Sequence, residues 1–224
     1  MKSLQTITIG GRESRRLTAP IELRAIGDSE QSNIVFGYAA KFNSRSGNLG
    51  EANRQFYETI APGAFDDVLL DDVRALFNHE ADMILARSKN GEGTLTLGID
   101  DVGLTYMFEA PDTQVGRDLL VSLRRGDIDQ SSFSFTVSKD GQSWVESRDE
   151  NGATVFERTI NKVSRLYDVS PVTYPAYEDT EVDVRSITTL IKDFQPEETP
   201  PPAPLENHSL SHWQRRWGIS KPAV

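Results

Sequence analysis

The 224-residue chain contains no cysteine, and this absence excludes several kinds of chemistry. Without thiols the chain cannot form disulfides, bind zinc through thiolates or use a cysteine nucleophile. Long apolar runs are also missing, so no transmembrane helix is expected, and the N-terminus lacks the apolar core of a secretory signal. These absences favour a cytoplasmic setting and give no reason to expect a membrane partner.

Positive charge is scarce as well. Lysine and arginine number 24 against 34 aspartate and glutamate residues, which gives a formal net charge of -10. Proteins that bind nucleic acid usually present basic patches, so this balance argues against nucleic-acid binding by the main domain. The tail carries a short tryptophan and arginine cluster, Trp213–Trp217, whose rings could stack on bases. One short cluster is more typical of a protein-docking tail, and nucleic acid is not an expected partner.

Histidine is the third scarce residue type. The chain has three, His79, His208 and His212. Only His79 lies in the part of the chain that we predict to fold, so any histidine-dependent reaction in the domain must use it. We expect neither a metal ion nor a cofactor.

Composition divides the chain into three regions. Residues 1–19 contain several basic side chains and few large apolar ones, and we predict a flexible basic arm. Residues 20–186 carry the regular apolar patterns of a folded domain. The prolines of 196–204 indicate an extended linker, so 187–224 is predicted to be a Pro-rich linker followed by a tail.

Within residues 20–186, short runs of alternating apolar and polar residues predict many strands, and Asp100–Gly103 predicts a hairpin turn. The strongest helix pattern is Val115–Arg125, with Gly126 in the position that favours a helix end. Pro62–Leu69 predicts a second, short helix. The pattern as a whole predicts an α+β domain that is mostly β, a closed or nearly closed barrel with a few short helices.

The stretch Gln130–Val137 alternates small hydroxyl side chains with large apolar ones. Successive strand residues point to opposite faces, so the phenylalanines share a core-facing side. Ser131 falls on that side and is a poor candidate for a reactive group. Ser132 and Ser134 share the other face, so the alternation of side chains between faces (parity) does not show which of them would be the reactive serine.

A serine hydrolase needs a base to take the hydroxyl proton and a third group to orient that base. His79 ends a predicted apolar strand and is the available base, although a lone histidine there is more often structural. Asp168 is the best third member because it lies in an apolar strand, where an aspartate is seldom found unless it has a partner. Its simpler interpretation is an ion pair with Arg165 or Arg87.

Other carboxylates are weaker candidates for the third position. Glu80 adjoins His79 but would point the other way if the strand continued. Glu109 and Asp101 lie near a predicted edge or turn. Residue chemistry alone therefore leaves the third member open.

Several segments together resemble the prohead (capsid maturation) protease family of tailed bacteriophages, which is distantly related to the herpesvirus assemblin serine proteases. The segments fall in the order found in that family and cover residues 20–186. They are Ala61–Phe65, Val73–Glu80, Leu85–Ser88, Gly93–Leu97, Asp101–Leu104, Gly126–Phe135 and Asp168–Tyr177.

The resemblance implies a herpesvirus-protease-like β-barrel flanked by short helices, with a serine nucleophile activated by histidine. The histidine of the Asn-His-acid motif falls on His79. The serine before the first phenylalanine of the Ser-Phe-x-Phe motif falls on Ser132, and many members have glycine at the position of Ser134. The third member falls on Asp168, where the family usually has glutamate.

The function implied by the resemblance is a serine endopeptidase of virion maturation. It would cleave the scaffolding region of the major capsid protein inside the assembled procapsid and then cleave itself, so it would be packaged in the procapsid in the host cytoplasm. The implied partners are the capsid protein and the chain itself, including a possible homo-oligomer. The tail, 187–224, would tether the protease during assembly and be removed by self-cleavage. The alternative is a non-catalytic capsid-assembly or scaffold-binding β module, in which the serines and histidine are structural.

Overall fold

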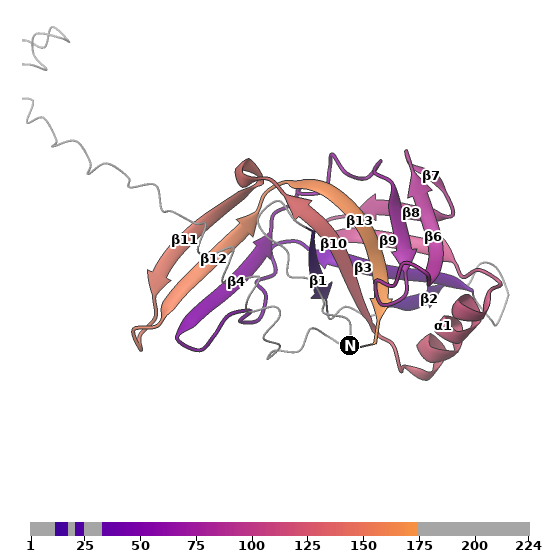
Figure 1. Ribbon diagram of the computed structural model, residues 1–224, viewed down its shortest axis with the longest axis horizontal. Helices are drawn as coiled ribbons and strands as arrows, with labels where there is room; N and C mark the ends of the chain where they lie inside the picture. The colour runs from indigo at the N-terminus through magenta and orange to yellow at the C-terminus, as the bar shows by residue number, and fades with distance from the viewer. Residues whose placement is uncertain (1–11, 18–20, 25–32, 174–224) are drawn as a thin grey trace, which may run out of the picture. The chain divides into compact units, whose positions relative to one another are not determined.

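The computed structural model describes residues 12–17, 21–24 and 33–173, all within a unit that spans Met1–Asp193 (Figure 1). The predicted linker and tail, 187–224, lie outside the described residues. The elements in chain order are β1 (Glu13–Leu17), β2 (Glu22–Arg24), β3 (Ile34–Lys41), β4 (Arg54–Ile60), β5 (Val73–Leu76), β6 (Ile84–Lys89), β7 (Glu92–Gly93), β8 (Leu95–Ile99), β9 (Gly103–Glu109), α1 (Gln114–Arg125), β10 (Gln130–Val137), the 3-10 turn η1 (Lys139–Gly141), β11 (Gln142–Arg148), β12 (Thr154–Ile160) and β13 (Val163–Val172).

The strands form three sheets. A six-stranded sheet has the order β1-β10-β13-β5-β6-β7, a four-stranded sheet the order β2-β3-β9-β8, and a three-stranded sheet the order β11-β12-β4. Most neighbours are antiparallel, whereas β13 pairs with β5 and β12 pairs with β4 in parallel. Figure 1 shows β10 and β13 side by side through the middle of the unit, with the β11–β12 hairpin to one side of them.

The prediction of a mostly β domain is confirmed, but the barrel is not, because the strand pairing of the described residues closes no barrel. The helix predicted at Pro62–Leu69 was wrong, since this segment forms successive turns with bonds between residues three apart, such as Asp66 N–H to Gly63 C=O at 3.2 Å. Gly63 has a φ of 83° there, which no α-helix allows. None of the described helices is both long and apolar enough to cross a membrane.

Helix α1 follows the predicted pattern closely because both of its ends are capped. Thr113 accepts a hydrogen bond from the Gly116 N–H, and Gly126 ends the helix in the left-handed conformation with a φ of 76°. Leu119 and Leu120 are buried on its inner face, which docks the helix on the core.

The core is built around the apolar face of β10. The rings of Phe133 and Phe135 stack with centroids 4.8 Å apart, and Phe65 meets Phe133 edge-on at 5.6 Å. Ser131 lies on this same side, where its hydroxyl shares a hydrogen bond of 2.7 Å with the buried Tyr106 hydroxyl. The opposite face of β10 is therefore left for Ser132 and Ser134, as parity predicted.

Part of the predicted flexible arm is ordered. Glu13–Leu17 forms β1, which pairs antiparallel with β10 at the edge of the six-stranded sheet. Without β1, the backbone groups along this side of β10 would have no neighbouring strand, so β1 satisfies an otherwise open sheet edge. The remainder of 1–19 lies outside the described residues.

Candidate active site

His79 stands in a tight turn directly after β5, three residues beyond the end of that strand. Asn78 and His79 both have left-handed backbones, with φ of 53° and 62°. Asn78 is tied to the end of β13, because its N–H donates to the Pro171 carbonyl at 3.0 Å and its side-chain oxygen accepts from the Thr173 N–H at 3.0 Å. This conformation, uncommon for residues other than glycine, turns the imidazole toward β10 and β13.

Strand register supplies the other groups of the site. Across the antiparallel pair β10–β13, Ser132 lies opposite Ser170 and Ser134 lies opposite Asp168. Cross-strand partners share a face, so these four polar side chains gather on one side of the sheet. All four are buried.

The three predicted site residues meet in this cluster. The Ser132 hydroxyl oxygen lies 2.6 Å from His79 Nε2, and Asp168 Oδ1 lies 2.5 Å from His79 Nδ1. The imidazole thus bridges a hydroxyl and a carboxylate through its two nitrogens. This is the arrangement that lets a histidine accept a serine proton while a carboxylate fixes its tautomer.

Ser134 occupies a different place from Ser132. Its hydroxyl oxygen lies 3.2 Å from His79 Nδ1, the nitrogen that faces Asp168, and 2.7 Å from the Ser14 hydroxyl of β1. Ser170 resembles it, with 3.3 Å to the same nitrogen. Of the two serines that parity left open, only Ser132 contacts Nε2.

Asp168 is buried yet held as a charged group. Burial by itself would raise its pKa, but hydrogen bonds and charge from His79, the nearby Arg12 cation and a hydrogen bond from Ser170 outweigh this and lower the pKa. The Ser170 hydroxyl donates to Oδ1 at 2.9 Å, and Arg12 forms an ion pair with Oδ2. Asp168 therefore enters the cluster as a carboxylate.

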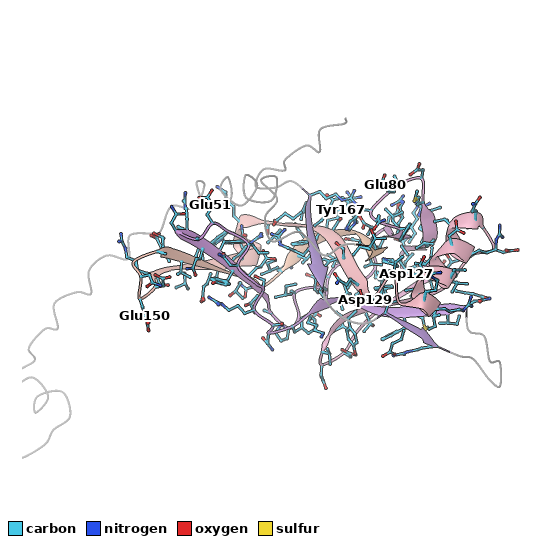
Figure 2. The ribbon with its side chains drawn as sticks, turned by 90° about the horizontal axis from the view of Figure 1, so that it is seen from below. Glu51, Glu80, Asp127, Asp129, Glu150 and Tyr167 are labelled. Carbon is cyan, nitrogen blue, oxygen red and sulfur yellow. The ribbon has the colours of Figure 1, made fainter. Side chains whose placement is uncertain are left out.

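The two arginines suggested as ion-pair partners of Asp168 contact other residues. Arg87 is paired with Asp72 at 2.7 Å, and the Arg165 guanidinium lies over the ring of Tyr167. The other acids considered for the third position, Glu80, Glu109 and Asp101, are exposed. Glu80 follows His79 in the chain but points into solvent, and it is labelled in Figure 2 together with Tyr167 of β13 and Glu150 at the tip of the β11–β12 hairpin.

Sequence reasoning missed three contributors to the site. Ser170 carried a usable signal, since it lies two residues after Asp168 and so shares its face. Arg12 and Ser14 carried none, because nothing in a short charged segment indicates that it pairs with β10.

The Ser132 hydroxyl donates to the Arg15 carbonyl of β1 at 2.9 Å. A hydroxyl has one proton, so a serine that donates to Arg15 does not donate to His79.

Comparisons with known proteins show the family to which the chain belongs. A family model described as caudovirus prohead serine protease matches residues 19–193. The comparison with curated proteins found no match. Among solved structures, the bacteriophage T4 capsid assembly protease, gp21, is similar, with 9% sequence identity over 73% of this chain and 98% of that chain and a TM-score of 0.38.

The family match spans most of the chain and contains the clustered histidine, serine and aspartate. The chain belongs to the caudovirus prohead serine protease family.

Proposed function

We propose that the chain is a serine endopeptidase in which Ser132 is the nucleophile, His79 the general base and Asp168 the group that orients the base. The observation that carries this proposal is the imidazole of His79, which contacts Ser132 through Nε2 at 2.6 Å and Asp168 through Nδ1 at 2.5 Å. His79 is also the only histidine of the family-matched segment.

The proposed reaction follows from these contacts. Ser132 Oγ attacks the carbonyl carbon of a peptide bond while its proton passes to His79 Nε2. His79 gives that proton to the leaving amine, and the acyl group remains on Ser132. Water then attacks the acyl-enzyme with His79 again acting as base, which releases the acid and restores the hydroxyl. Asp168, with its lowered pKa, stays ionised and stabilises the imidazolium that forms.

The substrate we propose is the scaffolding region of the major capsid protein, cleaved inside the assembled procapsid, followed by the protease itself. Membership of the prohead protease family supports this. In this proposal the enzyme works within the procapsid in the host cytoplasm. In this proposal 20–186 is the protease domain, and 187–224 tethers the chain during assembly and is then removed. A homo-oligomer is compatible with co-packaging.

Substitution of the nucleophile tests this function. Ser132→Ala and His79→Ala should each abolish cleavage of co-expressed capsid protein while particles still assemble. Ser134→Ala is the matched control, because it removes a hydroxyl from the same strand face without touching Nε2, and it should retain cleavage. Cleavage that survives Ser132→Ala and is lost in Ser134→Ala would contradict our choice of nucleophile.

One observation favours the alternative, a non-catalytic assembly module: Ser132 is buried, and its hydroxyl is held by the Arg15 carbonyl. A fluorophosphonate probe, which labels activated serines, separates the two functions. Labelling of the full chain that is absent from Ser132→Ala supports the protease. A chain that is never labelled and never cleaves, even within assembled particles, supports the assembly module.

A further inference from the structure

The strand β1 covers the edge of β10, the strand that carries Ser132. It runs antiparallel to β10 with Arg16 paired opposite Ser132 and Ser14 opposite Ser134. Figure 1 shows β1 beside β10, on the side that faces β4 and β12. An extended peptide that adds to an open sheet edge makes the same backbone arrangement, so β1 lies where a strand-like ligand of β10 would lie.

The backbone of β1 meets the proposed nucleophile at one specific peptide group. The Arg15 carbonyl oxygen accepts the Ser132 hydroxyl at 2.9 Å, and that hydroxyl also contacts His79 Nε2. The Arg15–Arg16 peptide bond is therefore the bond that β1 presents to the site. In a substrate held in the same way, Arg15 would be the residue before the cleaved bond.

The side chain of Arg15 is bound by a buried acid. Its Nε donates to Glu58 Oε1 at 2.7 Å and its terminal nitrogen donates to Glu58 Oε2 at 3.0 Å, a two-point contact that suits the planar guanidinium. Glu58 lies on β4 and is 5% exposed. A carboxylate in this position distinguishes a basic side chain from a neutral one of similar size.

Glu13, two residues before Arg15, is bound by a buried arginine, Arg158. Its two carboxylate oxygens accept from the terminal nitrogens of Arg158 at 2.6 and 2.9 Å, and Arg158 on β12 is 1% exposed. Burial by itself would raise the pKa of Glu13, but Arg15 and Arg158 lower it. Glu13 and Arg15 alternate with Ser14, so both point to the side of β1 that faces these two charges.

Glu58 and Arg158 are paired in register across β4 and β12 and touch each other at 2.9 Å. A buried ion pair is seldom the most stabilising choice, because removing two charges from water costs about as much as their attraction returns. Apolar residues would serve the core equally well. A pair of opposite charges that faces β1 has a clearer role in recognising a peptide with the complementary pattern.

We propose that protein substrates bind as an extended strand on the β10 edge in place of β1, and that Glu58 and Arg158 select a basic residue before the cleaved bond and an acidic residue two positions earlier. This inference rests on the proposed protease function and adds its cleavage preference, the pattern acidic-x-basic. β1 is then an internal occupant of the substrate site, and it must leave before a substrate enters.

The test uses peptide binding, so that it does not depend on turnover. The full chain carrying Ser132→Ala, which cannot cleave, also carries Arg15→Gln, which loosens β1 from Glu58 and reduces its advantage as a tethered competitor. The probe is a fluorescent peptide with the sequence of residues 12–17, RESRRL, and its binding is followed by anisotropy. Three further peptides carry Arg15→Gln, Glu13→Gln or Arg16→Gln.

The peptides with Arg15→Gln and Glu13→Gln should bind at least about tenfold more weakly than the parent, because each deprives a buried charge of one of its partners of opposite charge. The peptide with Arg16→Gln has the same net charge as that with Arg15→Gln, and the proposed preference does not involve this position, so it should bind within about twofold of the parent. Equal binding of these two peptides, or no binding of any peptide, overturns the proposal.

A change in the protein checks which residue reads the basic side chain. Glu58→Gln, added to the binding variant, should remove most of the difference between the parent peptide and the peptide with Arg15→Gln. Glu157→Gln, an exposed neighbour on β12, is the matched control and should leave that difference intact. Thermal unfolding shows whether Glu58→Gln folds, and if it does not, the peptide series decides. If the peptides bind selectively but the fluorophosphonate probe never labels the wild type, the proposed protease function is contradicted and the proposed peptide-binding site is still supported.

Discussion

Asp168 is a carboxylate that the folded chain keeps ionised although it is buried, and its surroundings explain how. His79, Arg12 and Ser170 each direct positive charge or a hydrogen bond at it, and together they lower its pKa below the ordinary value of 3.8 despite the opposing effect of burial. The residue was predicted from its placement in an apolar strand. Its partner Arg12 could not be, because Arg12 is far away in the chain and is brought near only by β1.

Asp168→Asn should change both catalysis and the acid stability of the chain. The amide cannot stabilise the imidazolium, so probe labelling of Ser132 should slow by something on the order of 10,000-fold, as for other serine triads. Because the folded-state pKa is lowered, the carboxylate stabilises the fold above about pH 3.8, and this contribution disappears as the pH falls through the lower folded-state value.

Denaturant unfolding at a series of pH values measures the second effect. The wild type should lose stability relative to Asp168→Asn as the pH falls below about 3.8, because only the wild type has this carboxylate to protonate. Parallel pH profiles for the two proteins would show that Asp168 is not the ionised group that we describe.

At the scale of single elements, local sequence signals decided what could be predicted. Helix α1 was predictable because Thr113 and Gly126 cap a segment with an apolar face. The turn after β5 was predicted as strand through His79, since two non-glycine residues with left-handed backbones leave no local signal. β1 was also missed, because its strand partner, β10, and the charges that contact its side chains, on β4 and β12, all come from far along the chain.

Asn78→Ala should show what the turn after β5 contributes to the site. Alanine tolerates the left-handed backbone less well than asparagine and cannot accept from the Thr173 N–H, so we expect a loss of about 1–2 kcal/mol in unfolding free energy. Labelling of Ser132 should also slow because His79 loses its orientation. Both are measured on the same preparation.

Asn90→Ala is the control for that variant. Asn90 has a left-handed backbone with a φ of 57° in the turn between β6 and β7, which does not contribute to the cluster around His79. It should lose stability through the less favourable left-handed backbone, without slower labelling. If the two variants slow labelling equally, the turn after β5 has no special part in placing His79.

On the scale of the whole described unit, two separate sheets meet at one charged contact. The six-stranded sheet contributes Glu13 and Arg15 through β1, and the three-stranded sheet contributes Glu58 and Arg158. Alternation within strands could be predicted from the sequence, and it correctly assigned the two faces of β10. The contact between the two sheets could not be predicted from the sequence. Charged residues at strand positions usually face solvent, so nothing indicated that Arg158 would be buried.

Arg158→Met tests whether this contact serves stability or recognition. Removing the cation leaves Glu58 buried without its partner on β12, and we expect a loss of about 3–5 kcal/mol in unfolding free energy, measured with denaturant. Arg45→Met removes an exposed arginine from its pair with Glu157 and should cost less than about 1 kcal/mol.

The double variant Arg158→Met/Glu58→Met separates the two roles. Because it removes both buried charges together, most of the stability lost in Arg158→Met should return. Peptide selectivity should not return, since the double variant has no charge left to recognise either side chain. A double variant as unstable as the single one would mean that the pair is kept for folding, and the recognition role would then lose its main physical argument.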